Sequence, residues 1–292
     1  AQGTRLTQNL LHDNQAPAFA KKLKGSMMCQ DIFVEVSHGP TLIDHNIMLS
    51  DASLRFATQG VAMVHNLICG ALTDVGGGTG TRYTPYHIPH RTEVMGFMTF
   101  LHGDDRFYNN IFVQKWPSED IMMMHDSDEG FDSENRLVGT WMFDEYPTYE
   151  EWISQFDFTK PANMKALEPA HFGHLPVWTE GNVYLGGAKA CKNEVNGLVI
   201  ANDRNDIKVE LVEKDGSYYL DTNVYDFLGD FTSRMINTDV LGKAFEPEQK
   251  FENPDGSSIC FDKDYFGEHR GIRVISGPFA SADDVKKPLY KI

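Results

Sequence analysis

Four short stretches of the chain share one pattern: an apolar residue, two variable residues, an asparagine and two apolar residues. They are Leu6-Thr7-Gln8-Asn9-Leu10-Leu11, Ile43-Asp44-His45-Asn46-Ile47-Met48, Met63-Val64-His65-Asn66-Leu67-Ile68 and Phe107-Tyr108-Asn109-Asn110-Ile111-Phe112. Successive asparagines are 37, 20 and 44 residues apart, which fits a period of about 20 to 23 residues with two periods in the last interval. Short apolar stretches at this period, without helical periodicity, predict a parallel β-solenoid whose coils stack on one another.

The recurrent asparagine suits a turn at a fixed point of each coil. Asparagine tolerates the left-handed conformation, and its side chain can bond to the neighbouring coil. The long first interval contains an insertion, Ala16 to Gln30, which interrupts the strand pattern with proline, lysine and small residues. Chance recurrence of so short a pattern is the alternative. A leucine-rich repeat has a similar period, but the regularly spaced leucines that it needs are missing.

The pattern fades after about Gln114, and the rest of the chain has mixed signals. Ser118 to Ser133 is rich in acidic residues and methionine and indicates a loop, and Pro147 to Phe156 indicates a short helix. Alternating apolar residues on both sides of Asp215-Gly216 predict a hairpin within Asp206 to Tyr225. We therefore expect an all-β chain, with coils carrying the active site over residues 1–115. Residues 116–292 would be an irregular β-rich region packed on the coils, or else a small separate β domain.

Composition excludes several classes of protein. The 292 residues are 41% hydrophobic and 23% charged, as in ordinary globular proteins, and the formal net charge is −16. That charge argues against nucleic acid as a partner and fits a neutral substrate better than a polyanionic one. No apolar run is long enough to span a membrane. The N-terminus lacks the features of a signal peptide, although the chain does not begin with methionine.

Cysteine usage leaves the compartment open. Cys29, Cys69, Cys191 and Cys260 are far apart and form no CxxC pair, so we expect buried or inert free thiols. A secreted or periplasmic location is slightly favoured over the cytoplasm. The sequence does not determine the oligomeric state, and a homo-oligomer is left open.

Glu35 is the first candidate for chemistry. It lies in Phe33-Val34-Glu35-Val36-Ser37-His38-Gly39-Pro40, where an acid stands between two valines on a predicted strand, a position that disfavours glutamate. Alternation places Glu35 on the face opposite Val34. A glycosidase needs such a carboxylic acid, partly desolvated and beside a sugar. The alternative is a solvated glutamate on the outside of a coil.

Other polar residues gather in the same coils. They include His45, Asp51, His65, His87, His90, Arg91, Glu93, Asp104, Asp105 and Arg106. No compact ligand spacing such as HExxH is present, so we expect neither a metal nor another cofactor. The stretch Gly76 to Gly80 lacks the GK[ST] ending of a phosphate loop, and no GxSxG motif indicates a serine hydrolase.

Several motifs, taken in order, resemble one family. They are Ala1-Gln2-Gly3-Thr4-Arg5, Asn9-Leu10, Phe33-Val34-Glu35-Val36 with His38-Gly39-Pro40, Asn46, Val64-His65-Asn66-Leu67-Ile68 with Gly70, Thr84-Pro85-Tyr86-His87, His90 with Thr92-Glu93-Val94, and Gly103-Asp104-Asp105-Arg106-Phe107-Tyr108-Asn109-Asn110-Ile111-Phe112. Together they resemble glycoside hydrolase family 120. The resemblance covers residues 1 to about 115 well and the rest loosely.

The resemblance implies a retaining β-xylosidase on a right-handed parallel β-helix, acting on xylo-oligosaccharides. It implies that Glu35 is the general acid/base. The family's nucleophile is an aspartate in a W-L-D-W stretch before A-Q-G-T-R, and here it would be the third residue upstream of Ala1, so we expect an N-terminal segment or chain to supply it. His38, His65, His90 and Glu93 are candidates for binding sugar hydroxyls, with structural roles as the alternative. The insertion Ala16 to Gln30 and Arg91, where a serine is usual, depart from the family.

The repeat provides a check on this pair of carboxylates. Glu35 precedes Asn46 by the same number of residues as the upstream aspartate precedes Asn9. Equivalent positions in adjacent coils lie about 4.8 Å apart, close to the roughly 5–5.5 Å of a retaining pair and below the roughly 6.5–9.5 Å of an inverting pair. Three alternatives remain: an α-L-arabinofuranosidase or other glycosidase on the same scaffold, a polysaccharide lyase, and a non-catalytic glycan-binding protein.

Overall fold

A computed structural model provides the structure of the chain, and it describes residues 2–14, 30–74, 83–115, 137–157, 159 and 173–291. The predicted insertion at Ala16 to Gln30, except Gln30 itself, lies outside the described residues. So do the glycine stretch Gly76 to Gly80 and the loop Ser118 to Ser133. The expectation of a β-rich fold built on parallel sheets is confirmed, with few and short helices in the part that is described.

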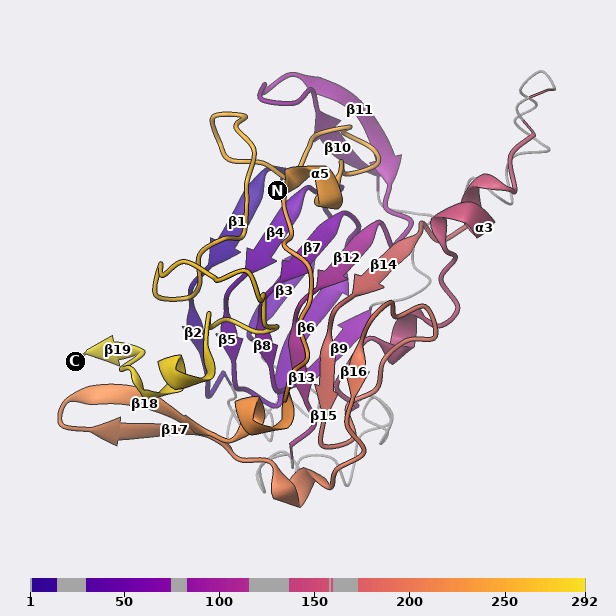
Figure 1. The fold of residues 1–292 in the computed structure, drawn as a ribbon. Helices are drawn as coiled ribbons and strands as arrows, with labels where there is room; N and C mark the ends of the chain where they lie inside the picture. The colour runs from indigo at the N-terminus through magenta and orange to yellow at the C-terminus, as the bar shows by residue number, and fades with distance from the viewer. Residues whose placement is uncertain are drawn as a thin grey trace, which may run out of the picture.

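Three parallel sheets form the body of the molecule (Figure 1). The first sheet contains, in spatial order, β1 (Thr4–Thr7), β4 (Thr41–Asp44), β7 (Val61–Val64), β12 (Asp105–Tyr108) and β14 (Val177–Glu180). The second contains β2 (Leu10–Leu11), β5 (Ile47–Met48), β8 (Leu67–Ile68), β13 (Ile111–Val113), β15 (Val183–Leu185) and β16 (Leu198–Val199). The third contains β3 (Ile32–Glu35), β6 (Ala52–Ala57) and β9 (Ala71–Asp74). From β1 to β9 the chain visits the first, second and third sheets in turn and adds one strand to each on every pass. After β9, the strands that the structure describes in these sheets join only the first and second.

Each position of the sequence pattern forms its own column of stacked side chains. Ile43 pairs in register with Met63, and Met63 with Phe107, so the first apolar positions of three repeats lie one above another. All three are fully buried between the sheets. Farther along, the rings of Phe112 and Tyr184 are stacked with centroids 5.2 Å apart. The period of the sequence pattern is therefore the number of residues in one coil, after which the next residue stacks in the same column.

The pattern asparagines form a continuous hydrogen-bonded ladder. The side-chain oxygen of Asn66 accepts the backbone N–H of Asn46 (2.9 Å) and its Nδ2 (3.0 Å). Asn66 makes the same two bonds to Asn110, at 3.0 and 2.9 Å. The Nδ2 groups of Asn46, Asn66 and Asn110 also donate to a carbonyl of the previous coil, as Asn66 does to Ile43 (2.9 Å). The predicted bonding between coils is therefore present.

The predicted left-handed conformation lies one residue earlier than expected. Positive φ angles occur at Gln8 (58°), His45 (54°), His65 (56°) and Asn109 (56°), each directly before a ladder asparagine. This part of the expectation was wrong because the ladder asparagine uses its amide for bonds along the stack, while the residue before it turns the chain between two sheets.

The ladder continues into a coil that the pattern did not reveal. Asn182 accepts from Asn110 at 2.9 and 3.0 Å, and Glu194 in turn accepts from the backbone and side chain of Asn182. Thr179 occupies the position where an apolar residue was required, so the pattern missed this repeat. The hydrogen bonding of the sheets thus continues past residue 115 through β14, β15 and β16, and the division into two regions at that residue stays a prediction.

Two further apolar clusters lie on the outer faces of the sheets. Ile47, Leu67 and Ile111 of the second sheet contact Tyr225 and Phe279, and the outer face of the first sheet is covered by residues such as Phe251 and Phe261. In Figure 1 this C-terminal chain, orange to yellow, runs across the front of the sheets. It includes η3 (Arg204–Asp206), η4 (Val224–Phe227), α5 (Thr238–Leu241), η5 (Ala282–Lys286) and β19 (Tyr290–Lys291).

Local predictions outside the coils are also confirmed. The predicted hairpin is β17 (Val209–Lys214) with β18 (Ser217–Thr222), and Asp215 and Gly216 turn it with φ of 53° and 70°. The predicted helix is α3 (Tyr149–Ile153), which follows η2 (Trp141–Phe143) and begins with a capping box between Thr148 and Glu151. Of the described cysteines, Cys69 and Cys191 are buried, but Cys260 is exposed. No helix among the described residues is long and apolar enough to cross a membrane.

We expect Asn66→Ala to lower the free energy of unfolding by about 3 kcal/mol, because it strands buried partners in two coils without their hydrogen bonds. Asn9→Ala is the matched control, since Asn9 makes the same bonds to Asn46 at 3.0 and 2.8 Å but is exposed. That variant should lose about 1 kcal/mol or less. Urea unfolding measures both, and equal losses would show that burial of the ladder does not matter.

Candidate functional site

Glu35 ends β3, the edge strand of the third sheet. β3 pairs with β6, with Glu35 opposite Ala57, and within the described residues no strand pairs with its other side. Ile32 is buried and Val34 packs on the core, whereas Phe33 and Glu35 are exposed, as the predicted alternation requires. The described residues do not provide the desolvation that a glycosidase acid needs, so the catalytic role of Glu35 stays a prediction.

The outer face around Glu35 carries an aromatic ring held by a cation. Phe33 is 47% exposed, and the guanidinium of Arg55 on the neighbouring strand lies 5.2 Å from the centre of its ring. Phe33 and Arg55 are in register across β3 and β6. This cation–π contact fixes the ring two residues before Glu35, on the same face of the sheet.

The turn after Glu35 is packed too tightly for a side chain. Gly39 has φ of 71°, and a Cβ there would lie 2.3 Å from the carbonyl oxygen of Gly60 in the next coil. His38 beside it is buried, and its Nε2 lies 3.2 Å from the carbonyl oxygens of both Thr84 and Met98. Burial lowers the pKa of His38, so the neutral ring donates from Nε2 to these carbonyls. His38 therefore ties the turn to the two strands above it.

Those two strands, β10 (Tyr83–His87) and β11 (Val94–Thr99), form an antiparallel hairpin at the upper end of the sheets in Figure 1. Its loop carries two predicted binding residues. His90 Nε2 lies 2.8 Å from Glu252 Oε1, and Glu93 lies 3.4 Å from Arg91 on the exposed surface. The side chain of Gln2 also bonds to the backbone of His87 at 2.9 and 3.0 Å. The hairpin is thus anchored to the start of the chain and to the C-terminal region.

A pocket of about 510 Å³ opens between these three segments. Arg5, His90, Arg91, Lys250 and Glu252 bring charge to its lining. Pro40, at the end of the turn that follows Glu35, also lines it. The structure therefore brings His90 to the pocket and His38 to the turn between Glu35 and the hairpin.

His65 lies elsewhere, in a buried column at the turns between the first and second sheets. It is fully buried and stacks on His45 with ring centres 5.3 Å apart. Its Nδ1 lies 3.2 Å from the carbonyl oxygen of Gly277, and its Nε2 lies 3.2 Å from the amide of Asn109. This burial favours a structural role for His65 over contact with a sugar.

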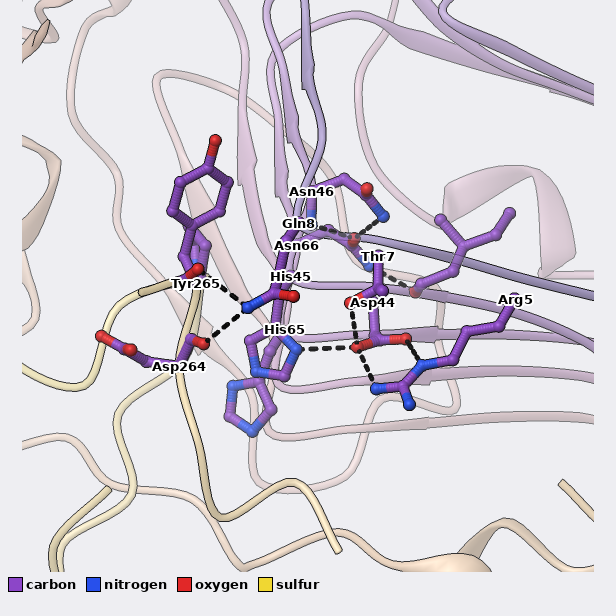
Figure 2. A network of polar contacts seen from close by, with 12 residues as sticks. Arg5, Thr7, Gln8, Asp44, His45, Asn46, His65, Asn66, Asp264 and Tyr265 are labelled. Carbon is purple, nitrogen blue, oxygen red and sulfur yellow. Dashed lines mark hydrogen bonds and ion pairs between the residues drawn. The ribbon is translucent and has the colours of Figure 1, made fainter. Parts of the chain in front are cut away.

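Next to that column is a buried carboxylate that the sequence analysis did not single out. Figure 2 shows Asp44 receiving bonds from Arg5 (2.8 and 2.9 Å), Thr7 (2.8 Å) and His45 (2.9 Å). Burial alone would raise the pKa of Asp44, but the bonds from Arg5 and His45 outweigh it and hold this pKa below its usual value. In the same figure, Gln8 donates to the carbonyls of Asp264 and Tyr265, which attaches the C-terminal region to the first coil. The available signal was an aspartate directly after the apolar residues Leu42 and Ile43.

Asp104 and Arg106 form a second buried ion pair, at 2.6 Å. Arg106 also donates to the carbonyl oxygens of Leu241 (2.9 Å) and Lys243 (2.8 Å). These residues therefore hold the C-terminal region on the first sheet. Among the residues that the structure describes, no group of three or more His, Cys, Asp and Glu side chains is arranged to hold a metal ion.

The fold was compared with known proteins. Neither a scan of protein-family models nor a search of curated proteins found a match. Among solved structures, the chain is similar to a complex of XylC with xylose, with a TM-score of 0.73 and 31% sequence identity. The similarity covers 96% of this chain and 38% of that protein, so the chain spans well under half of its length. Membership of glycoside hydrolase family 120 stays a prediction.

The pH dependence of stability tests the buried histidine column. Burial holds the pKa of His65 in the folded protein well below its ordinary value, so protons bind preferentially to the unfolded chain as pH falls below about 6.5. Stability should therefore fall between pH 7 and pH 5. His65→Asn should reduce that slope by up to about 1.4 kcal/mol per pH unit.

Asparagine is the matched replacement because Asn109 occupies the same column with the same positive φ. Urea unfolding at pH 8 gives the loss caused by substitution itself, since protonation plays no part there. An unchanged slope between pH 7 and pH 5 would rule out His65 as a source of the pH dependence.

Proposed function

We propose that this chain is the part of a retaining β-xylosidase that carries the general acid/base, Glu35, and that it acts on β-xylosides and xylo-oligosaccharides. The observation that carries the proposal is the likeness of almost the whole chain to a protein bound to xylose. The exposed carboxylate at the edge of the third sheet agrees with it. In this proposal the three sheets wind as a right-handed parallel β-helix, of the kind that the family resemblance implies.

The edges of the sheets support a nucleophile from outside the 292 residues. β1, β2 and β3 are the edge strands of the three sheets at the same end of the stack, and their outer sides have no strand partner in the described part of the chain. A preceding coil that added a strand to β3 would place a residue beside Glu35 at about 4.8 Å. An aspartate there would meet the roughly 5–5.5 Å separation of a retaining pair.

The proposed reaction then has two steps. The aspartate attacks the anomeric carbon while Glu35 donates a proton to the leaving oxygen, and the glycosyl–enzyme bond forms as the glycosidic bond breaks. Glu35, now ionised, removes a proton from water, which displaces the aspartate and releases xylose with its configuration retained. The same coil would cover the exposed carboxylate of Glu35 and supply the desolvation that is missing here.

We propose different roles for the other predicted binding residues according to where they lie. We propose His90 and Glu93 of the hairpin loop as contacts for sugar hydroxyls, because they are exposed and His90 lines the large pocket. His38 acts through its position, since both carbonyls that it contacts belong to the hairpin above Glu35. For His65 we propose a structural role in the turn, because its side chain is fully buried.

The first test is hydrolysis of p-nitrophenyl β-xyloside by the native preparation, with the intact mass recorded on the same sample. We expect activity together with a second polypeptide, or a longer chain, that contains the W-L-D-W segment. If the segment is present and the xyloside is not hydrolysed, the assignment as a xylosidase is wrong. Arabinosides and other pentosides would then be tested as substrates.

The second test is substitution of the acid. Glu35→Gln should lower kcat/KM by roughly 10²- to 10⁴-fold, because it removes general acid and base catalysis while keeping the size of the side chain. Glu210→Gln, at an exposed position on β17, is the control and should keep full activity.

Azide separates a catalytic from a structural role. With Glu35→Ala and an activated aryl xyloside, azide should restore turnover and give a β-xylosyl azide, because an anionic nucleophile needs no general base. A variant that stays inactive with azide, or a product of inverted configuration, would contradict the assignment. Binding of xylosides without hydrolysis by any preparation would favour a non-catalytic glycan-binding protein.

A further inference from the structure

An aromatic pocket of about 300 Å³ lies on the outer face of the first sheet, away from Glu35. It is lined by Tyr149 and Trp152 of α3, Trp178 of β14, Tyr108 of β12, and Phe245 of the loop after α5. β14 is the edge strand of its sheet, on the side from which α3 extends in Figure 1. β1 forms the opposite edge, four strand spacings or about 19 Å away.

The rings hold one another in a partly open arrangement. Trp152 meets Phe245 edge to face, with centroids 5.2 Å apart and an interplanar angle of 88°, and it lies 6.1 Å from Tyr149. Tyr149 and Phe245 are 47% and 44% exposed. Large aromatic rings that gather around a cavity and remain in contact with water are typical of a binding surface.

The floor of the pocket is preorganised by the Asp104–Arg106 pair. The guanidinium of Arg106 lies between two rings, 4.6 Å from the centre of Trp178 and 4.8 Å from that of Phe251. Asp104 accepts the backbone N–H of Phe245 at 2.7 Å, and Arg106 holds the carbonyls of Leu241 and Lys243. Both charged side chains are almost completely buried, so the loop that carries Phe245 is fixed before any ligand arrives.

The lining selects the kind of ligand. A cation is disfavoured because Arg106 and Lys243 both line the cavity, and a polyanion is disfavoured because the Arg106 charge is already paired with Asp104. A neutral ligand with apolar faces and hydroxyl groups at its edges matches aromatic walls with a few polar groups between them. A pyranose sugar has this character, since its axial C–H groups can lie on an aromatic ring while its hydroxyls point sideways.

We propose that this pocket is a second sugar-binding site, which holds a xylose unit of an oligosaccharide outside the catalytic centre. The pyranose class follows from the pocket, and the choice of xylose rests on the proposed function. Such a site would keep the chain associated with a polymeric substrate and raise the local concentration of chain ends near Glu35.

The tryptophans themselves can report on this site. The chain contains four, and Trp152 and Trp178 line the pocket, whereas Trp141 lies in η2 and does not. The ¹⁹F NMR spectrum of the 5-fluorotryptophan-labelled chain would be recorded during titration with xylotetraose, with signals assigned by Trp→Phe substitution. We expect the signals of Trp152 and Trp178 to shift and that of Trp141 to stay in place.

The affinity is then compared between variants through the Trp178 signal, which reports on this pocket alone. Trp152→Ala should raise the midpoint of the titration by about tenfold, the loss expected when an aromatic contact is removed. Tyr290→Ala, which removes an exposed aromatic ring on β19, is the matched control and should leave the midpoint unchanged. Thermal unfolding of each variant shows that it is folded.

Failure of this proposal is distinguishable from failure of the proposed function. Hydrolysis of p-nitrophenyl β-xyloside tests the function separately, because that substrate carries a single sugar. Hydrolysis with fixed Trp152 and Trp178 signals, or with equal midpoints for Trp152→Ala and wild type, would overturn the second site and leave the function standing. Binding that depends on Trp152 without any hydrolysis would support the site and overturn the function.

Discussion

The asparagine ladder is the interaction on which the rest of the structure depends. A turn between two stacked sheets exposes backbone N–H and C=O groups that neither sheet can satisfy, and here those turns lie inside the protein. An inner asparagine such as Asn66 satisfies two of these backbone groups: its oxygen accepts the backbone N–H of Asn46, and its Nδ2 donates to the carbonyl of Ile43 in the same coil. Its oxygen also accepts the side-chain Nδ2 of Asn46, which links the asparagines to one another. Each such bond contributes on the order of 1 kcal/mol net, and losing it inside the protein costs more. The ladder therefore sets the register at which the apolar columns stack.

Ionisable side chains are buried next to the ladder, in the turns that precede its asparagines. The residue before each asparagine turns the chain and faces the C-terminal region, which makes a second column of Gln8, His45, His65 and Asn109. His45 and His65 are buried there as neutral rings, because burial lowers the pKa of both. Asp44, one residue earlier, keeps its charge only because Arg5 and His45 bond to it. The buried negative charge of Asp44 is thus balanced by the positive charge of Arg5.

The two candidate sites lie at positions that the stacking of the strands leaves on the surface. Strand alternation turns Phe33 and Glu35 outward, and β3 is the edge strand of its sheet in the part of the chain that the structure describes. The tight turn at Gly39 and the carbonyl contacts of His38 then bring the β10–β11 hairpin to the same end of the stack. At the opposite edge, β14 and α3 leave an aromatic pocket on a rigid floor. The same stacked sheets therefore carry both candidate sites. One edge presents the carboxylate of Glu35, and the other presents the aromatic pocket.

From the sequence alone, the spacing of Asn9, Asn46, Asn66 and Asn110 was sufficient to predict parallel stacked strands, because a repeat of constant length returns each residue to its own column. Alternation likewise placed Glu35 on the face opposite Val34, and Asp215-Gly216 located the hairpin. The coil at Asn182 was missed because Thr179 broke the apolar pattern, although its backbone pairs in the same way. The burial of His65, the Asp44 and Asp104 ion pairs and the aromatic pocket were decided only by the tertiary structure. The Arg5–Asp44 pair, the burial of His65, the anchoring of Arg106 to Leu241 and the pocket all depend on contacts between segments more than 35 residues apart in the chain. No local pattern encodes which distant segment will cover a given face.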